Sequence, residues 1–125
     1  MTRTQVLRQW TIFASKLRDP PPMPRIVMST LPWRGHYAAG TVTLSYTVPV
    51  SVVHHEFAHW LFDYNRVWGT WIGADFLKAI GRRSWDWLAR ELFAACLAWL
   101  TCGRWFWKRS PAGAEALRPL LKEGT

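Results

Sequence analysis

Cysteine is scarce in this sequence, and its placement excludes two common ways of stabilising a small domain. The only two, Cys96 and Cys102, form neither a C-x-x-C motif nor a paired framework, so zinc-ribbon and disulfide-scaffold folds are ruled out. Long apolar runs are missing too, because the most apolar stretch, residues 92–102, is too short to span a bilayer. Residues 1–17 lack the apolar region and cleavage site of a secretion signal. We therefore expect a soluble, cytoplasmic protein in a reducing compartment.

Acidic residues are also few: eight Asp and Glu stand against sixteen Lys and Arg, which gives a formal charge of +8. That balance favours an acidic partner such as nucleic acid, an anionic membrane or an acidic protein. A basic, solvated surface with no such partner is an equally good interpretation. Tryptophan is abundant instead. A small core cannot enclose all ten, so some should lie at the surface and mark contact areas.

Hydrophobic spacing and turn residues predict an α+β fold in one domain. A helix comes first and ends at a proline-rich stretch; a small sheet of about three strands follows, and then more helices. Within the sheet, a hairpin turns at Ala39-Gly40. Pro49 is expected in the first turn of the second helix, and Ser84 is expected to cap the fourth, with Asp86 in its first turn. The predicted helices cover 3–18, about 50–65, 70–81, 84–103 and 111–122, and the predicted strands cover 25–29 and the two arms of 35–47.

One motif carries clear chemistry. Residues 55–59 read HEFAH and fit H-E-x-x-H. On a helix, His55 and His59 lie one turn apart on the same face, so both imidazoles can reach one zinc ion. Glu56 points beside that ion, where it can act as general base on a water molecule. The flanking residues are apolar, which indicates a core helix in which unpaired charge would be costly. The sequence therefore predicts a zinc site here.

The third ligand follows largely by elimination, since no histidine comes after His59. His54 lies about 100° around the helix from the ligand face, which favours an exposed or supporting histidine. His36, in the hairpin, is a poor candidate. Asp63 lies about 12 Å along the helix from the first ligand, so it should orient a histidine or cap the helix end. Glu91 sits in an apolar helix where zinc would account for its charge, although a surface acid paired with Lys or Arg is the alternative.

At this point the sequence resembles a known family. H-E-x-x-H followed downstream by E-x-x-A-x-x-x-A, here ELFAACLA at 91–98, is similar to the ImmA/IrrE-like metallopeptidases. These are compact gluzincins whose zinc is held by two histidines and a glutamate, and the resemblance covers about residues 25–100. It implies a single metallopeptidase-like domain over 1–125, with a core at about 25–102 and a basic C-terminal tail at 103–125. No helix-turn-helix is recognisable, and the tryptophan load is unusual for the family.

The resemblance implies a small zinc-dependent endopeptidase, with Zn²⁺ on His55, His59 and Glu91 and with Glu56 as the catalytic base. A phage or mobile-element protease that acts on a regulatory protein is the implied setting, although the substrate stays open. The strand at 41–47 is expected to be the edge that takes up the substrate backbone. A group that stabilises the tetrahedral intermediate is also expected, and the candidates are Tyr37, Tyr46, Tyr64 and Arg90. A DNA-associated protease of the SprT type is disfavoured, because it needs a later histidine and a cysteine zinc ribbon.

A basic aromatic segment, CGRWFWKRS at 102–110, leaves a second function open. Cations interleaved with aromatic rings suit single-stranded nucleic acid or a membrane interface. We favour the simpler interpretation of a helix end, where aromatic residues finish the core and basic residues suit the helix dipole. The alternative function is a catalytically silent, zinc-stabilised binding module that contacts DNA or an acidic protein through a basic, Trp-rich surface.

Overall fold

The computed structural model describes residues 1–32, 35–105 and 107–124. Over these ranges the chain forms an N-terminal helix, a three-stranded mixed sheet and then four more helices, which confirms the predicted α+β class. The helices are α1 (Arg3–Ser15), α2 (Val50–Tyr64), α3 (Trp71–Ala79), α4 (Trp87–Cys102) and α5 (Pro111–Ala116). The strands are β1 (Arg25–Ser29), β2 (Gly35–Ala38) and β3 (Thr41–Ser45), and single 3₁₀ turns cover Val67–Gly69 and Arg118–Leu120. None of the helices in the described ranges is long and apolar enough to cross a membrane.

The sheet has the order β1-β3-β2, with β1 parallel and β2 antiparallel to the central strand. The hairpin turns at Ala39-Gly40, as predicted, and both residues have positive φ angles of 47° and 82°. Such angles match the twist of tight two-residue hairpin turns. The prediction that 41–47 is the edge strand is wrong, because β3 has a hydrogen-bonded neighbour on each side. The two outer strands of the sheet are β1 and β2, and β2 is the one at the hairpin end of the strand order.

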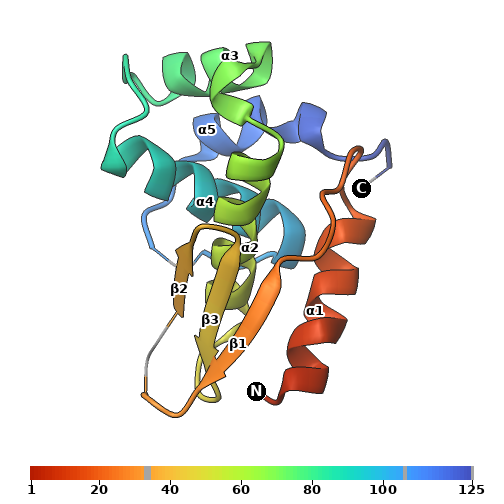
Figure 1. Ribbon diagram of the computed structural model, residues 1–125. Coiled ribbons are helices and arrows are strands. Elements are labelled where there is room, and N and C mark those ends of the chain that lie inside the picture. The colour runs from red at the N-terminus through yellow and green to blue at the C-terminus, as the bar shows by residue number, and fades with distance from the viewer. Residues whose placement is uncertain (33–34, 106, 125) are drawn as a thin grey trace.

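Helix α2 lies in the middle of the molecule, with the sheet in front, α1 on one side and α4 crossing behind it (Figure 1). All of residues 51–58 are buried, as expected of a helix that is covered on every face. Helix α2 packs most extensively against α4. Three small residues of α4 are fully buried: Ala94, Ala95 and Ala98. Small side chains allow two helix backbones to approach closely. This packing places Glu91, at the start of the same helix face, opposite the HEFAH motif.

Several predicted helix ends need correction. Helix α1 ends at Ser15, before the predicted 18, and Pro49 precedes α2 as its N-cap residue. Helix α4 is capped by Asp86 and not by Ser84, because the Asp86 carboxylate accepts a 2.9 Å hydrogen bond from the Ala89 amide and also pairs with Arg82. The predicted stop of α4 at Gly103 is confirmed, and this residue has the left-handed φ of +74° that glycine tolerates best.

The C-terminal segment returns to the end of α1, and Figure 1 shows the two side by side. Leu17 and Leu121 form an isolated antiparallel bridge, flanked by backbone hydrogen bonds from Arg18 to Leu120 and from Lys122 to Lys16, both 2.9 Å long. Three side chains of this segment join the core: Ala114, Leu117 and Leu121. The proposed boundary between a core and a tail at residue 103 stays a prediction.

Candidate metal centre

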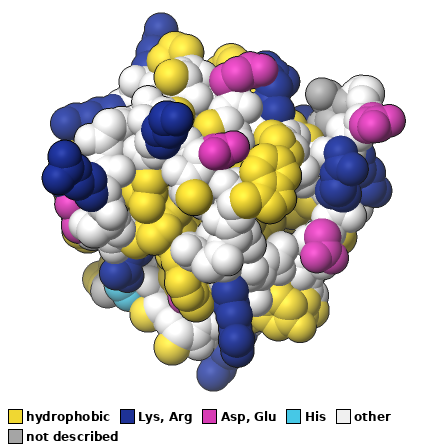
Figure 2. Space-filling view, turned by 90° about the horizontal axis from the view of Figure 1, so that it is seen from above, with side chains coloured by type: hydrophobic (Ala, Val, Ile, Leu, Met, Phe, Trp, Pro, Cys, Tyr) yellow, Lys and Arg dark blue, Asp and Glu magenta, His cyan; other side chains and the backbone are white. Residues whose placement is uncertain are grey.

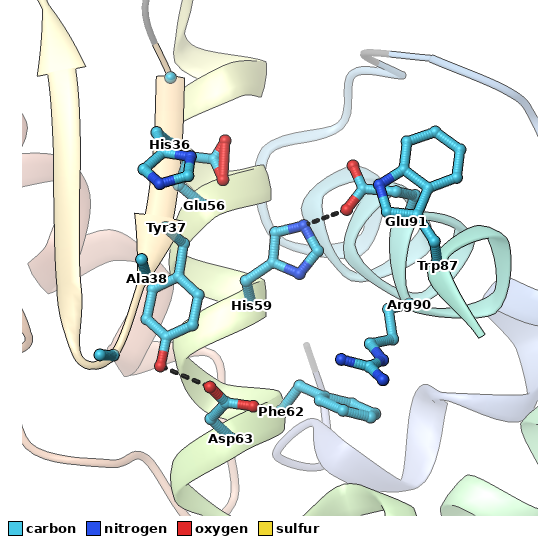
Figure 3. A pocket seen from close by; sticks show the side chains of 12 residues that line it. His36, Tyr37, Ala38, Glu56, His59, Phe62, Asp63, Trp87, Arg90 and Glu91 are labelled. Carbon is cyan, nitrogen blue, oxygen red and sulfur yellow. Dashed lines mark hydrogen bonds and ion pairs between the residues drawn. The ribbon is translucent and has the colours of Figure 1, made fainter. Parts of the chain in front are cut away.

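The structure brings together the three side chains that the sequence nominated as metal ligands. His55 and His59 project from one face of α2, and Glu91 reaches them from α4. The Nε2 atom of His55 lies 3.1 Å from Oε1 of Glu91, and Nε2 of His59 lies 2.7 Å from Oε2 of the same carboxylate. One ligand atom from each residue lies within 4.8 Å of the others. Figure 3 shows His59 and Glu91 facing each other across the gap between the two helices.

These distances fit a metal ion. Ligand atoms around a tetrahedral zinc, with bonds of about 2.0–2.1 Å, lie roughly 3.4 Å apart. The separations of 3.1 and 2.7 Å between the imidazole nitrogens and the Glu91 oxygens are somewhat shorter than that value, and one donor atom from each of the three residues lies within 4.8 Å of the others. Two imidazoles and one carboxylate are also a donor set that zinc accepts in sites that keep a fourth position for substrate or water. The group is therefore a possible metal site of two histidines and one glutamate.

The pKa shifts of His55 and Glu91 suit metal binding, which requires neutral imidazole and ionised carboxylate. His55 is 1% exposed, and burial lowers its pKa despite the opposing effect of its hydrogen bond to Glu91. Burial acts to raise the pKa of Glu91, but the hydrogen bonds from His55 and His59 outweigh it and bring the value to about 2. Glu91 is thus a carboxylate at any pH near neutrality. The alternative interpretation of Glu91 as a surface acid paired with Lys or Arg is wrong, since its partners are the two histidines.

Glu56 follows His55 in the chain and lies beside the ligand group. Its side chain lines the same cleft yet is only 7% exposed. Burial raises the pKa of Glu56 to about 7, with a smaller lowering effect from His59 and a smaller raising effect from Glu91. The carboxylate is packed under the first residue of β2: a Cβ on Gly35 would lie 3.3 Å from Glu56 Oε2 and only 2.4 Å from Cγ1 of Val52. A residue without a side chain therefore lets the strand close over this carboxylate.

Two of the candidate ligands, His59 and Glu91, line a cleft of about 540 Å³ between the edge strand β2 and the helices α2 and α4 (Figure 3), and the third, His55, is buried. Acids, histidines, other aromatic rings and one arginine line it, together with small residues of the hairpin. Because β2 forms one wall, its open backbone edge runs beside the candidate ligands. The lining residues are Gly35, His36, Tyr37, Ala38, Ala39, Glu56, His59, Phe62, Asp63, Trp87, Arg90 and Glu91.

Comparison with known proteins identifies no relative of this chain. A scan against protein-family models, a search of curated proteins and a search of solved structures all gave no match. The interpretation of the site therefore depends on the arrangement of its own side chains.

Of the four candidates for stabilising an intermediate, the cleft includes two, Tyr37 and Arg90. The Tyr37 ring stacks on that of His59, with centroids 6.3 Å apart and planes 13° apart. Burial, and then the hydrogen bond to Asp63, raise the pKa of Tyr37 to about 12. Tyr46 and Tyr64 lie outside the cleft lining and are about half exposed.

Asp63 and His36 line the cleft but are not part of the ligand group. Asp63 was expected to orient a histidine or cap α2. Instead its Oδ2 accepts a 2.7 Å hydrogen bond from the Tyr37 hydroxyl, and the ring of that tyrosine stacks on His59. Sequence reasoning missed this link, because Tyr37 and Asp63 are far apart in the chain and neither belongs to the motif.

His54 faces away from the ligand group, and the expectation of an exposed histidine is wrong. It is fully buried between α1, α2 and α4. Its Nδ1 lies 2.8 Å from Oγ1 of Thr101, and its Nε2 lies 2.9 Å from Oε1 of Gln9. Burial, with a smaller effect from Lys16, lowers the pKa of His54 to about 4, so the ring is neutral. It is a satisfied core histidine that joins three helices.

The segment 102–110 is described except for residue 106. Trp105 stacks on Trp99 of α4, with centroids 5.1 Å apart, and both rings pack against the core. The first part of the segment therefore agrees with the interpretation of a helix end whose aromatic residues complete the core. Beyond it, Trp107 is 38% exposed, packs edge-on against Trp87 at 5.8 Å, and has the Lys108 ammonium 5.2 Å from its ring. Figure 2 views the α3 end of the molecule, where Lys and Arg side chains are spread among apolar and acidic ones with no single basic patch.

Proposed function

We propose that this protein is a small zinc-dependent endopeptidase of the gluzincin type, similar to the ImmA/IrrE-like metallopeptidases. The observation that carries the proposal is the convergence of His55, His59 and Glu91, with donor atoms within 4.8 Å of one another, at an open cleft that also contains Glu56. A purely structural metal site needs no buried carboxylate next to its ligands. A hydrolytic site does.

In this proposal His55, His59 and Glu91 hold the zinc. When bound, zinc supplies a positive charge that polarises the peptide carbonyl and makes water more acidic. Glu56 takes one proton from the attacking water at a carboxylate oxygen while the water oxygen bonds to the carbonyl carbon. Glu56 then passes that proton to the amide nitrogen as the C–N bond breaks. Its position under Gly35 keeps the carboxylate in one place between the strand and the cleft.

The substrate backbone would lie along β2. Among the described residues this strand pairs with a strand on one side only, so its other edge is open to a further strand beside the cleft. An extended peptide can add to such an edge as a further strand, which explains why the reaction would act on unfolded or extended segments. The proposed physiological substrate is a phage or host regulatory protein.

The decisive experiment separates metal binding from cleavage. Purified wild type should carry about one zinc, and Glu56→Gln, which leaves all three ligands intact, should fold and bind zinc in the same way. Cleavage of an unstructured protein substrate should fall by at least about a hundredfold in this variant, the scale of general-base catalysis. Undiminished cleavage by Glu56→Gln, or full zinc occupancy in a His55→Ala/His59→Ala double variant, would contradict the proposal.

A second candidate is a zinc-stabilised binding module that contacts DNA or an acidic protein. Four described tryptophans are well exposed, namely Trp68, Trp71, Trp87 and Trp107, and Lys108 lies over one of them. Such rings can stack on unpaired bases. This function would survive Glu56→Gln unchanged, so the same variant distinguishes the two candidates.

A further inference from the structure

The metal cleft continues into a second hollow of about 440 Å³. The two share three lining residues, Phe62, Asp63 and Arg90, and the second hollow adds Trp68 and Trp85. A peptide bound beside the candidate ligands would therefore have a side pocket within reach of the residues that flank the reacting bond. The chemistry of this pocket bears on which residues the substrate carries.

Arg90 is the one cationic side chain among the described residues that line either hollow. Its Nε donates a 2.9 Å hydrogen bond to the Trp85 carbonyl oxygen, which fixes one edge of the guanidinium. Figure 3 shows the other end of the group extending into the space beside Phe62. No carboxylate of the described residues forms an ion pair with Arg90. The nearby acids pair with other groups: Glu91 with the histidines, Asp86 with Arg82, and Asp63 with the Tyr37 hydroxyl. Asp86 also feels the charge of Arg90, but more weakly than that of Arg82.

The walls around Arg90 are aromatic and fixed by mutual packing. The Phe62 ring lies 5.6 Å from that of Trp68 and 4.8 Å from that of Trp85, and Phe62 itself is only 4% exposed. Arg90 itself is exposed, so a ligand can reach its guanidinium from solvent, and the rings beside it offer flat apolar surface. The one acid in the hollow, Asp63, lies on the far side of Phe62, next to Tyr37 (Figure 3). A preorganised guanidinium between aromatic rings suits the fork geometry of a carboxylate.

Resting on the proposed function, we propose that Arg90 and this aromatic hollow form a carboxylate-binding subsite. The substrate is then a polypeptide with an Asp or Glu side chain, or its own terminal carboxylate, close to the cleaved bond. The excess of positive charge on the protein acts in the same direction by attracting acidic segments. Arg90 is thus a specificity-determining residue and not the group that stabilises the intermediate.

The test measures binding apart from cleavage. Zinc-loaded Glu56→Gln is titrated by calorimetry with blocked pentapeptides that differ only by Glu, Gln or Lys at one position, scanned through all five. A second arm compares free and amidated C-termini in the peptide without charged side chains, which separates the two sources of the carboxylate. Each series is repeated after adding Arg90→Gln, Arg90→Lys or, as a matched control, Arg83→Gln. Arg83 is an exposed residue outside both hollows, so this control removes the same charge.

We expect one position, or the free C-terminus, at which the carboxylate peptide binds about tenfold to a hundredfold more tightly than its neutral match. Arg90→Gln should abolish that preference, Arg90→Lys should retain part of it, and Arg83→Gln should leave it unchanged. Equal binding of Glu and Gln peptides, tighter binding of Lys peptides, or no binding across the series would overturn the subsite.

Cleavage of the same peptides by the protein with Glu56 intact then tests the proposed function separately. If carboxylate peptides bind through Arg90 but none is cleaved, the endopeptidase proposal fails and the subsite stands. If peptides are cleaved and Arg90→Gln lowers turnover equally for Glu and Gln peptides, the protease stands. Arg90 then stabilises the intermediate, and the subsite is wrong.

Discussion

The Tyr37 hydroxyl donates a 2.7 Å hydrogen bond to Oδ2 of Asp63 and accepts a 3.1 Å hydrogen bond from the amide of Gly40. One phenol thereby ties the edge strand, its hairpin turn and the end of α2 together. The same ring stacks on His59. The wall of the cleft that would receive the substrate is therefore fastened to the helix that carries the candidate ligands.

Tyr37→Phe should loosen that wall without disturbing the metal site. It keeps the ring on His59 but removes both hydrogen bonds, so the free energy of unfolding should fall by about 1 kcal/mol. Zinc content should not change, whereas the KM of a peptide substrate should rise. Urea unfolding, metal analysis and steady-state kinetics check these points. Tyr64→Phe is the control, as that residue lies outside the cleft. Loss of zinc in Tyr37→Phe would mean that the hydroxyl supports the ligands directly.

Glu91→Ala should weaken zinc binding far more than Asp63→Ala. Glu91 contacts both histidines and belongs to the ligand group, whereas Asp63 is hydrogen-bonded to Tyr37 and does not belong to it. The loss for Glu91→Ala should exceed the roughly 10–100-fold effect of removing an outer partner, and Asp63→Ala should fall at or below that range. Competition with a chromophoric chelator gives both affinities. The reverse order would remove Glu91 from the ligand set.

Gly35→Ala should displace Glu56 while leaving the ligands in place. The added Cβ would lie 2.4 Å from Val52 Cγ1 and 3.3 Å from Glu56 Oε2, so the strand or the helix must shift. Overpacking of this kind costs about 1–3 kcal/mol of stability. We expect lower turnover with full zinc occupancy. Gly69→Ala is a matched control, because a Cβ there meets nothing within 4 Å. Wild-type turnover in Gly35→Ala would show that the position of Glu56 is not critical.

His54→Ala should destabilise the fold by about 2–4 kcal/mol, because it leaves a cavity and deprives Gln9 and Thr101 of a buried partner. Under conditions in which it is folded, His54→Ala should bind as many zinc ions per chain as the wild type, since His54 faces away from the ligand group. Thermal unfolding and metal analysis at a temperature where the variant is folded separate the two effects. His36→Ala, an exposed histidine in β2, should show little change in stability. A folded His54→Ala without zinc would place this ring in the metal site.

The ligands of the candidate metal site could be predicted from the sequence because each one follows from a local feature of the chain. His55 and His59 share a face through helix periodicity alone, and Glu91 stood out as a charge in an apolar helix. The hairpin turn and the stop at Gly103 are likewise local, since each depends on backbone angles that glycine favours. These features need no knowledge of distant parts of the chain.

What sequence reasoning missed depends on contacts between distant residues. The burial of His54 requires Gln9 and Thr101, which come from two other helices. Strand β3 is central because β1 pairs with it in parallel, on the side opposite its hairpin partner β2. The alternation of apolar residues along a strand does not show which strands pair. The choice of Asp86 over Ser84 as a cap depends on how the loop before α4 lies, with Arg82 beside the carboxylate. Both residues cap helices well, so composition alone does not separate them.

The bridge between Leu17 and Leu121 has a consequence for how the chain folds as it is made. Arg18 bonds to Leu121 across a separation of 103 residues. At about 5–20 residues per second, the ribosome delivers that partner roughly 5–20 s after the end of α1 has been synthesised. Throughout that interval Leu17 and the apolar face of α1, with Val6 and Phe13, lack part of their final cover. The newborn chain should therefore be a chaperone client until its last turns emerge.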